Sequence, residues 1–148
     1  MLGYLLDVNV LIALFDPLHP HHDAAHAWFA ENRAQGWATC ATTVNGCIRV
    51  MSSPAYPSRV PLAQAVEMLR TLCAAPDHHY WPLAPALTDA TLIHPEQIPG
   101  PKQITDVHLL ATALQHQGKL VTFDRTIAWR AVVSAKQSDL VLPAIVEA

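Results

Sequence analysis

The sequence has few charged residues, and this shortage restricts what the protein can bind. Only 14% of the 148 residues are charged, against roughly 25% in an ordinary soluble domain. The 9 Lys and Arg residues and the 12 Asp and Glu residues give a net charge of -3, so no overall positive field attracts nucleic acid or an anionic membrane. Any contact with nucleic acid must therefore be local or mediated by a metal ion.

Cysteine is also scarce. The three cysteines form no CxxC pair and no cluster with histidine, which argues against both a disulfide framework and a structural zinc site. We therefore expect reduced thiols in a cytoplasmic protein. They are Cys40, Cys47 and Cys73.

Long apolar runs are missing near the N-terminus. No basic segment precedes the first apolar residues, and Asp7 interrupts them before the core of a signal peptide forms. The run from Val10 to Phe15 falls far short of the roughly 20 residues that cross a bilayer. The sequence thus predicts a soluble protein without a membrane contact.

Hydrophobic residues make up 51% of the chain, enough for one compact domain over residues 1–148 with a real core. Short apolar runs alternate with segments of helical periodicity, without a repeat or a linker, which predicts an α/β fold with a central, mainly parallel sheet. The expected strands cover residues 4–6, 37–42, 80–83, 119–123 and 140–142. The expected helices lie within 8–15, between Asp23 and Gly36, over 45–51, from Pro61 to Pro76, over 89–93, and from an N-cap at Thr105 to a terminating Gly118.

Three aspartates stand where strands end or helices begin. Asp7 follows the first strand, Asp124 follows the strand over 119–123, and Asp106 lies in the first turn of the preceding helix. In open parallel sheets the functional crevice lies beyond the carboxyl ends of the strands. Helix capping or turn formation explains each aspartate taken alone, but together they predict a cluster at one sheet edge.

Such a cluster favours a bound cation. Carboxylates a few ångströms apart raise one another's pKa, and a hard divalent ion such as Mg²⁺ or Mn²⁺ relieves the repulsion with oxygen ligands. A metal held there lowers the pKa of bound water and polarises a phosphoryl oxygen, which is the chemistry of phosphodiester hydrolysis.

Residues 6–14, 43–49, 104–111 and 120–125 resemble, in this order along nearly the whole chain, the PIN-domain toxins of VapC type. The resemblance implies an α/β/α sandwich and a Mg²⁺- or Mn²⁺-dependent endoribonuclease acting on transfer or ribosomal RNA. It also implies a homodimer that a VapB-type antitoxin neutralises. Asp7, Asp106 and Asp124 match three acidic positions of the family and are our candidates for catalysis and metal binding.

The fourth acidic position does not match. Family members usually carry a glutamate before the Asn45-Gly46 pair, where this chain has Val44, which cannot bind metal or accept a proton. Three explanations stay open: three aspartates suffice with the Asn45 amide, the nuclease is weakened or inactive, or the sequence is a selected variant. The alternative function is a catalytically silent PIN domain that binds antitoxin or RNA, and DNA cleavage is a further option.

Other polar residues are candidates for binding RNA or antitoxin. They are Asn9, Thr43, Asn45, Arg49 and Arg125, of which the two arginines suit phosphate or carboxylate groups. Four histidines follow the first helix. We expect these four to be solvated rather than metal ligands: His19, His21, His22 and His26.

Overall fold

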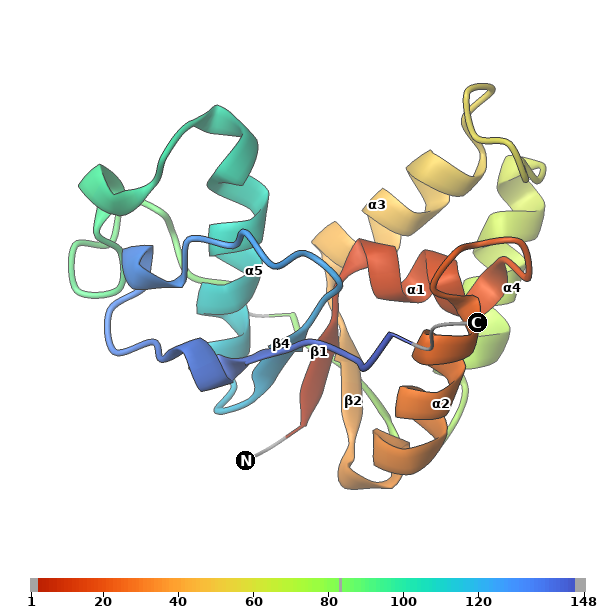
Figure 1. Cartoon of the computed structure of the whole chain (residues 1–148), viewed down its shortest axis with the longest axis horizontal. Coiled ribbons are helices and arrows are strands. Elements are labelled where there is room, and N and C mark those ends of the chain that lie inside the picture. Colours follow the sequence, from red (N-terminus) through yellow and green to blue (C-terminus); the bar gives the residue numbers. More distant parts are fainter. Residues whose placement is uncertain (1–2, 83, 146–148) are drawn as a thin grey trace.

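A single five-stranded sheet organises the protein. The computed structural model describes residues 3–82 and 84–145, and Figure 1 shows the chain. The strands are β1 (Tyr4–Leu6), β2 (Trp37–Thr39), β3 (His78–Tyr80), β4 (Lys119–Val121) and β5 (Leu140–Val141). Their order is β3-β2-β1-β4-β5, and every neighbouring pair is parallel. The prediction of a mainly parallel sheet is confirmed.

Helices cover both faces of this sheet. They are α1 (Val8–Phe15), α2 (His22–Asn32), α3 (Ala41–Met51), α4 (Leu62–Cys73) and α5 (Ile104–Gln115). In Figure 1, α1 to α4 gather on one side of the sheet and α5 lies on the other. None of these helices is long and apolar enough to cross a membrane, within the part of the chain that the structure describes.

The side chains of β1 show how two cores form. Successive strand residues point to opposite faces, and Tyr4 and Leu6 accordingly pack in the core beneath α1 to α4, while Leu5 packs with α5. Ala38 and Leu120 of the neighbouring strands join Leu5. β1 and β2 are buried throughout, which explains their apolar runs, whereas β3 at the sheet edge is partly exposed. The helical layers on both faces of the sheet confirm the α/β/α sandwich.

The second strand is shorter than the sequence predicts. β2 ends at Thr39, and α3 begins at Ala41 rather than at Asn45. The Cys40 backbone N–H donates to Thr43 Oγ1 at 3.0 Å, and the Thr43 hydroxyl lies 3.1 Å from the Cys40 carbonyl oxygen. Threonines favour strands by local propensity, but here this capping contact starts a helix.

Several predicted boundaries in the second half of the chain are wrong. The third strand is His78–Tyr80 instead of 80–83, of which Leu83 lies outside the described residues. Residues 89–93 form turns, not a helix. α5 begins at Ile104 with Gln103 as its N-cap, because a 3₁₀ turn over Pro101–Gln103 leads directly into it.

Two histidines of α2 form hydrogen bonds with the C-terminal end of α1. His22 Nδ1 lies 2.7 Å from the Ala13 carbonyl oxygen, and His26 Nε2 lies 2.7 Å from that of Leu14. A carbonyl only accepts, so each ring donates to one of the carbonyls that a helix C-terminus leaves without an internal partner. His26 is exposed, as expected, and His22 is half-buried, and both rings also hold the end of α1.

Gly118, just after α5, is needed because other parts of the chain pack closely against it, not because its backbone conformation requires glycine. Gln117, not Gly118, has the positive φ of 58° that follows the helix. A Cβ on Gly118 would lie 2.5 Å from the backbone oxygen of Gly3 and 2.7 Å from the Trp81 ring. Gly118 therefore lets the turn before β4 pack against the chain that leads into β1.

We expect Gly118→Ala to lower the free energy of unfolding by about 1–3 kcal/mol, the usual cost of overpacking, because the nearest atom is backbone and cannot yield. Gly100→Ala is the matched control, since a Cβ on Gly100 would meet no atom within 4 Å and its φ of 177° suits alanine. Urea unfolding of both variants measures the difference, and equal stabilities would contradict the packing argument.

Candidate active site

Asp7 lies at the carboxyl end of β1 and caps α1. Its Oδ1 accepts the Val8 backbone N–H at 2.7 Å, and the residue is only 5% exposed. Burial raises the pKa of Asp7, hydrogen bonds from Thr122 and Val8 lower it, and the Asp124 charge raises it again. The carboxylate is thus held in one orientation with another negative charge close by.

Thr122 is the centre of the polar contacts at this edge. Its hydroxyl donates to Asp7 Oδ2 at 2.8 Å and accepts from the Asp124 backbone N–H at 3.1 Å and from Asn9 Nδ2 at 3.2 Å. Asn9 Oδ1 in turn accepts the Phe123 N–H at 3.2 Å. Thr122 has no exposed surface. Sequence reasoning missed this residue, although a hydroxyl at the end of an apolar strand, two positions before Asp124, was a usable signal.

Asp106 faces the other two aspartates from α5. Burial, followed by the charges of Asp7 and Asp124, raises its pKa to about 6. The backbone and hydroxyl of Thr126 both donate to Asp124 Oδ1 at 2.7 Å and hold that carboxylate in its turn. The structure thus brings Asp7 together with two aspartates that lie about 100 residues further along the sequence.

This donor set suits a hard divalent cation. Among the residues that the structure describes, no group of three or more His, Cys, Asp or Glu side chains lies together in a way that could hold a metal ion. Mg²⁺ keeps several waters and takes one or two protein carboxylates directly, so a looser set of aspartates fits it. A cation would also relieve the repulsion that raises the pKa of Asp106.

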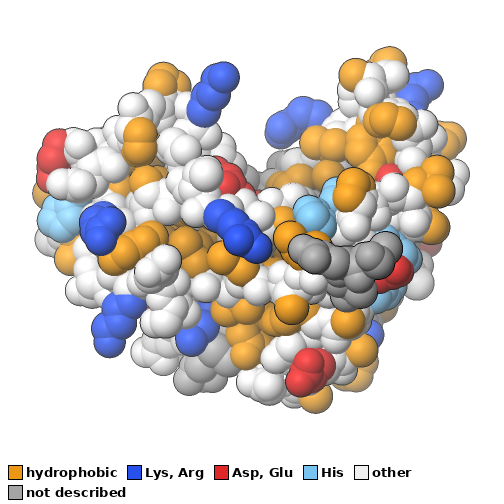
Figure 2. Space-filling model, in the orientation of Figure 1, with side chains coloured by type: hydrophobic (Ala, Val, Ile, Leu, Met, Phe, Trp, Pro, Cys, Tyr) orange, Lys and Arg blue, Asp and Glu red, His pale blue; other side chains and the backbone are white. Residues whose placement is uncertain are grey.

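The face of the molecule shown in Figure 2 has a hollow in its surface. Figure 2 shows this hollow between the α3–α4 side and the α5 side of the molecule, with acidic atoms inside it and Lys or Arg side chains on both sides. Asn45, Arg49 and Arg125 are exposed. Thr43, in contrast, is fully buried, and its contacts with Cys40 give it a role in helix capping.

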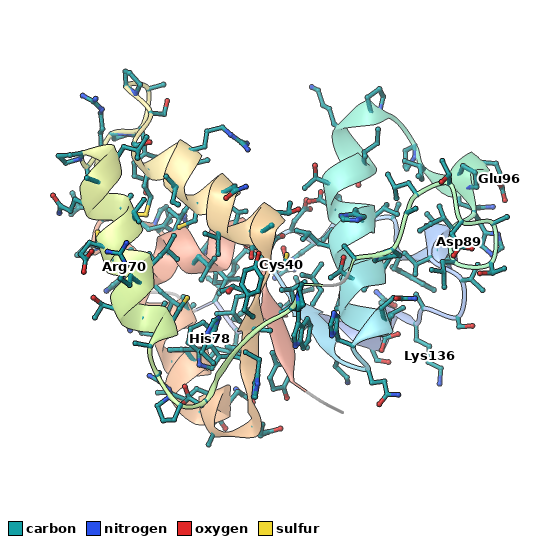
Figure 3. All side chains as sticks on the ribbon, turned by 180° about the vertical axis from the view of Figure 1, so that it is seen from behind. Cys40, Arg70, His78, Asp89, Glu96 and Lys136 are labelled. Carbon is teal, nitrogen blue, oxygen red and sulfur yellow. The ribbon has the colours of Figure 1, made fainter. Side chains whose placement is uncertain are left out.

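Position 44 lies among apolar side chains. Val44 and Ile48 line a hollow of about 250 Å³ between α3, α4 and β3, together with Leu69 and Tyr80. Seen from behind in Figure 3, Arg70 and His78 mark this α4 and β3 side, and Cys40 marks the start of α3 near the middle of the molecule. The surroundings of Val44 are therefore those of a packing residue.

Known proteins resemble the chain over almost its full length. The family model for the PIN domain matches residues 4–146. Ribonuclease VapC44 of Mycobacterium tuberculosis H37Rv is 43% identical over 136 residues, covering 92% of this chain and 96% of that protein. Ribonuclease VapC39 of the same strain is 39% identical over 126 residues, covering 84% and 90%. The crystal structure of FitAcB from Neisseria gonorrhoeae has a TM-score of 0.53 at 16% identity over 95% of this chain and 96% of that one, a likeness of fold.

We expect Thr122→Val to weaken Mn²⁺ binding about 10- to 100-fold, the usual cost of losing a group that orients a ligand. The variant leaves Asp7 Oδ2 without its hydroxyl donor while keeping the side-chain volume. Thr122→Ser restores the hydroxyl and is the control that should bind nearly as well as the original protein. Calorimetric titration compares the three proteins, and equal affinity of the valine variant would remove Thr122 from the site.

The raised pKa of Asp106 predicts a pH-dependent stability. Its pKa is about 6 in the folded protein against an ordinary value of 3.8, so ionised Asp106 destabilises the metal-free fold above pH 6, and the cost disappears as the pH falls through 6 toward 4. We expect Asp106→Asn to stabilise the protein in EDTA by about 1–2 kcal/mol at pH 8, allowing for solvent screening, and far less at pH 4. Thermal unfolding at both pH values checks this, and a less stable variant at pH 8 would contradict it.

Proposed function

The chain belongs to the PIN-domain family and, within it, to the VapC ribonucleases, and from this premise we propose that it is a divalent-metal-dependent endoribonuclease, the toxin of a toxin–antitoxin pair. The observation that carries the proposal is the convergence of Asp7, Asp106 and Asp124 at one edge of the sheet, where the charges of Asp7 and Asp124 raise the pKa of Asp106. We treat residues 1–148 as one PIN domain.

We assign the three aspartates to binding Mg²⁺ or Mn²⁺. The ion, when bound, lowers the pKa of a coordinated water and stabilises charge on the phosphoryl group. Thr122 keeps Asp7 oriented, and the Asn9 amide joins Thr122 to the Phe123 backbone so that the β4 end does not shift. These contacts hold the carboxylates in position before the metal ion and substrate bind, so the side chains need to move less during the reaction.

The apolar surroundings of Val44 support a site that works without a fourth carboxylate. Val44 lines the hollow beside α4, and among the described residues no buried polar side chain there lacks a hydrogen-bond partner that a glutamate would supply. On α3 the neighbouring Asn45 is exposed and offers a neutral amide oxygen. The second candidate function, a catalytically silent domain that binds antitoxin or RNA, rests on the same observation that position 44 lacks an acid.

The exposed Arg49 and Arg125 supply the charge for an RNA phosphate or an antitoxin carboxylate. We propose structured RNA of the transfer or ribosomal class as substrate, a VapB-type antitoxin as partner, and a cytoplasmic homodimer as the working form.

The test is cleavage of total cellular RNA by the purified protein with Mg²⁺ or Mn²⁺. We expect cleavage that EDTA abolishes and that Asp7→Asn slows by more than the roughly 10- to 100-fold typical of residues behind a metal ligand. Single-stranded and duplex DNA in parallel reactions test the choice of nucleic acid.

Val44→Glu distinguishes the two candidate functions. Cleavage by both the original protein and the variant supports a three-aspartate site, and cleavage by the variant alone indicates a nuclease disabled at position 44. Binding of RNA or antitoxin without cleavage by either protein would favour the silent domain.

A further inference from the structure

A second hollow lies at the start of α5, where Thr105 directly precedes Asp106 in the sequence. It measures about 410 Å³, within the roughly 300–1,000 Å³ of small-ligand pockets. Its walls come from three parts of the chain that meet beside Asp106. These are Thr42 at the start of α3, residues 85–87 of the loop after β3, and Ile104, Thr105 and His108 at the start of α5.

The loop wall of this pocket is attached to α5 before any ligand binds. His108 Nε2 lies 2.9 Å from the carbonyl oxygen of Pro85, which only accepts, so Nε2 donates the hydrogen bond. Pro85 itself is buried, although Ala86 beside it is exposed. The pocket is therefore preformed, and binding there requires little ordering of the loop.

The lining combines apolar surface with a few hydroxyls. Leu87 and Ile104 provide apolar contact, and Ile104 is 43% exposed although it is a large hydrophobic residue. Thr42 and Thr105 add hydroxyl groups that can donate and accept hydrogen bonds. A flat heteroaromatic ring with polar edges matches this lining.

Contacts with bases supplement the few phosphate contacts that this chain offers to RNA. Phosphate contacts by Lys and Arg normally dominate nucleic-acid binding, but the chain has only 9 basic residues and a net charge of -3. The acidic cluster itself repels a phosphodiester until a cation neutralises it. Sequence-selective proteins bind single-stranded RNA through unstacked bases, and Thr105 places this pocket one residue from Asp106.

We propose that this hollow, the base pocket, binds an unpaired nucleobase of the RNA next to the phosphodiester held at Asp7, Asp106 and Asp124. The choice of RNA as the ligand rests on the proposed ribonuclease function. The choice of a nucleobase rests on the residues that line the pocket.

The first experiment titrates the ¹⁵N-labelled protein with adenosine, cytidine and uridine in EDTA, with ribose as the control without a base. Uncharged nucleosides avoid repulsion by the aspartates. We expect amide shifts at Thr42, Ala86, Thr105 and His108 with at least one nucleoside and none with ribose. Shifts confined to other residues, or equal shifts with ribose, would overturn the base pocket.

Ala86→Trp fills the pocket from an exposed loop position and leaves the aspartates untouched. We expect it to weaken nucleoside binding about tenfold, the size of one lost base contact. Ala34→Trp is the matched control, because Ala34 is exposed on the turn before β2, at the opposite end of the parallel strands. Unchanged Mn²⁺ affinity in both variants shows that the aspartate cluster is intact, and unchanged nucleoside binding in Ala86→Trp would overturn the assignment.

The second experiment distinguishes RNA from a free nucleoside. A single-stranded RNA dodecamer containing 4-thiouridine is cross-linked to the protein in Mg²⁺, which neutralises the acidic cluster, and the attached peptide is identified by mass spectrometry. Cross-links within residues 84–87 or 104–108 support the RNA base, whereas cross-links only elsewhere would show that the pocket holds free nucleosides and overturn the proposal. Cross-linking there without cleavage in Mg²⁺ or Mn²⁺ would count against the ribonuclease function alone, and cleavage without cross-linking would count against the base pocket alone.

Discussion

One buried hydroxyl connects the ends of two parallel strands, and the geometry of the candidate site depends on it. Thr122 lies just beyond β4, donates to Asp7 beyond β1, and accepts the Asp124 N–H. β1 and β4 pair in register from Tyr4 to Leu6, so the two chain ends leave the sheet side by side. The hydroxyl then sets how far apart Asp7 and Asp124 lie, and α5 adds Asp106 from the other layer.

Repulsion between the carboxylates of this cluster lowers the stability of the metal-free fold. Asp106 shows it most clearly, because burial and two neighbouring charges raise its pKa to about 6. Elsewhere the chain carries few charges, and the described ion pairs lie outside the cluster, such as Arg33 with Asp77 at 2.8 Å. Electrostatic repulsion that is confined to one cluster of residues in an otherwise well-packed structure is typical of functional sites.

Helix α3 has different surroundings on its different faces. Gly46 and Cys47 are buried toward α1, where a Cβ at position 46 would lie 2.7 Å from the Val8 side chain. Val44 faces the apolar hollow beside α4, whereas Thr42 lines the pocket beside α5. One short helix thus packs the core and borders the pocket beside α5, because residues two positions apart on a helix lie on different faces.

The sequence alone determined the succession of strands along the chain and the parallel sheet, and it singled out the three aspartates as candidates, because apolar runs, periodicity and polar residues at strand ends are local patterns. Tertiary contacts decided the rest. The Thr43 cap on Cys40 began α3 early, the 3₁₀ turn before Ile104 moved the start of α5, and Thr122 became the centre of the site only when β4 lay beside β1. The contact between Thr122 and Asp7 joins residues more than 100 positions apart, and a pattern read along the chain does not contain it.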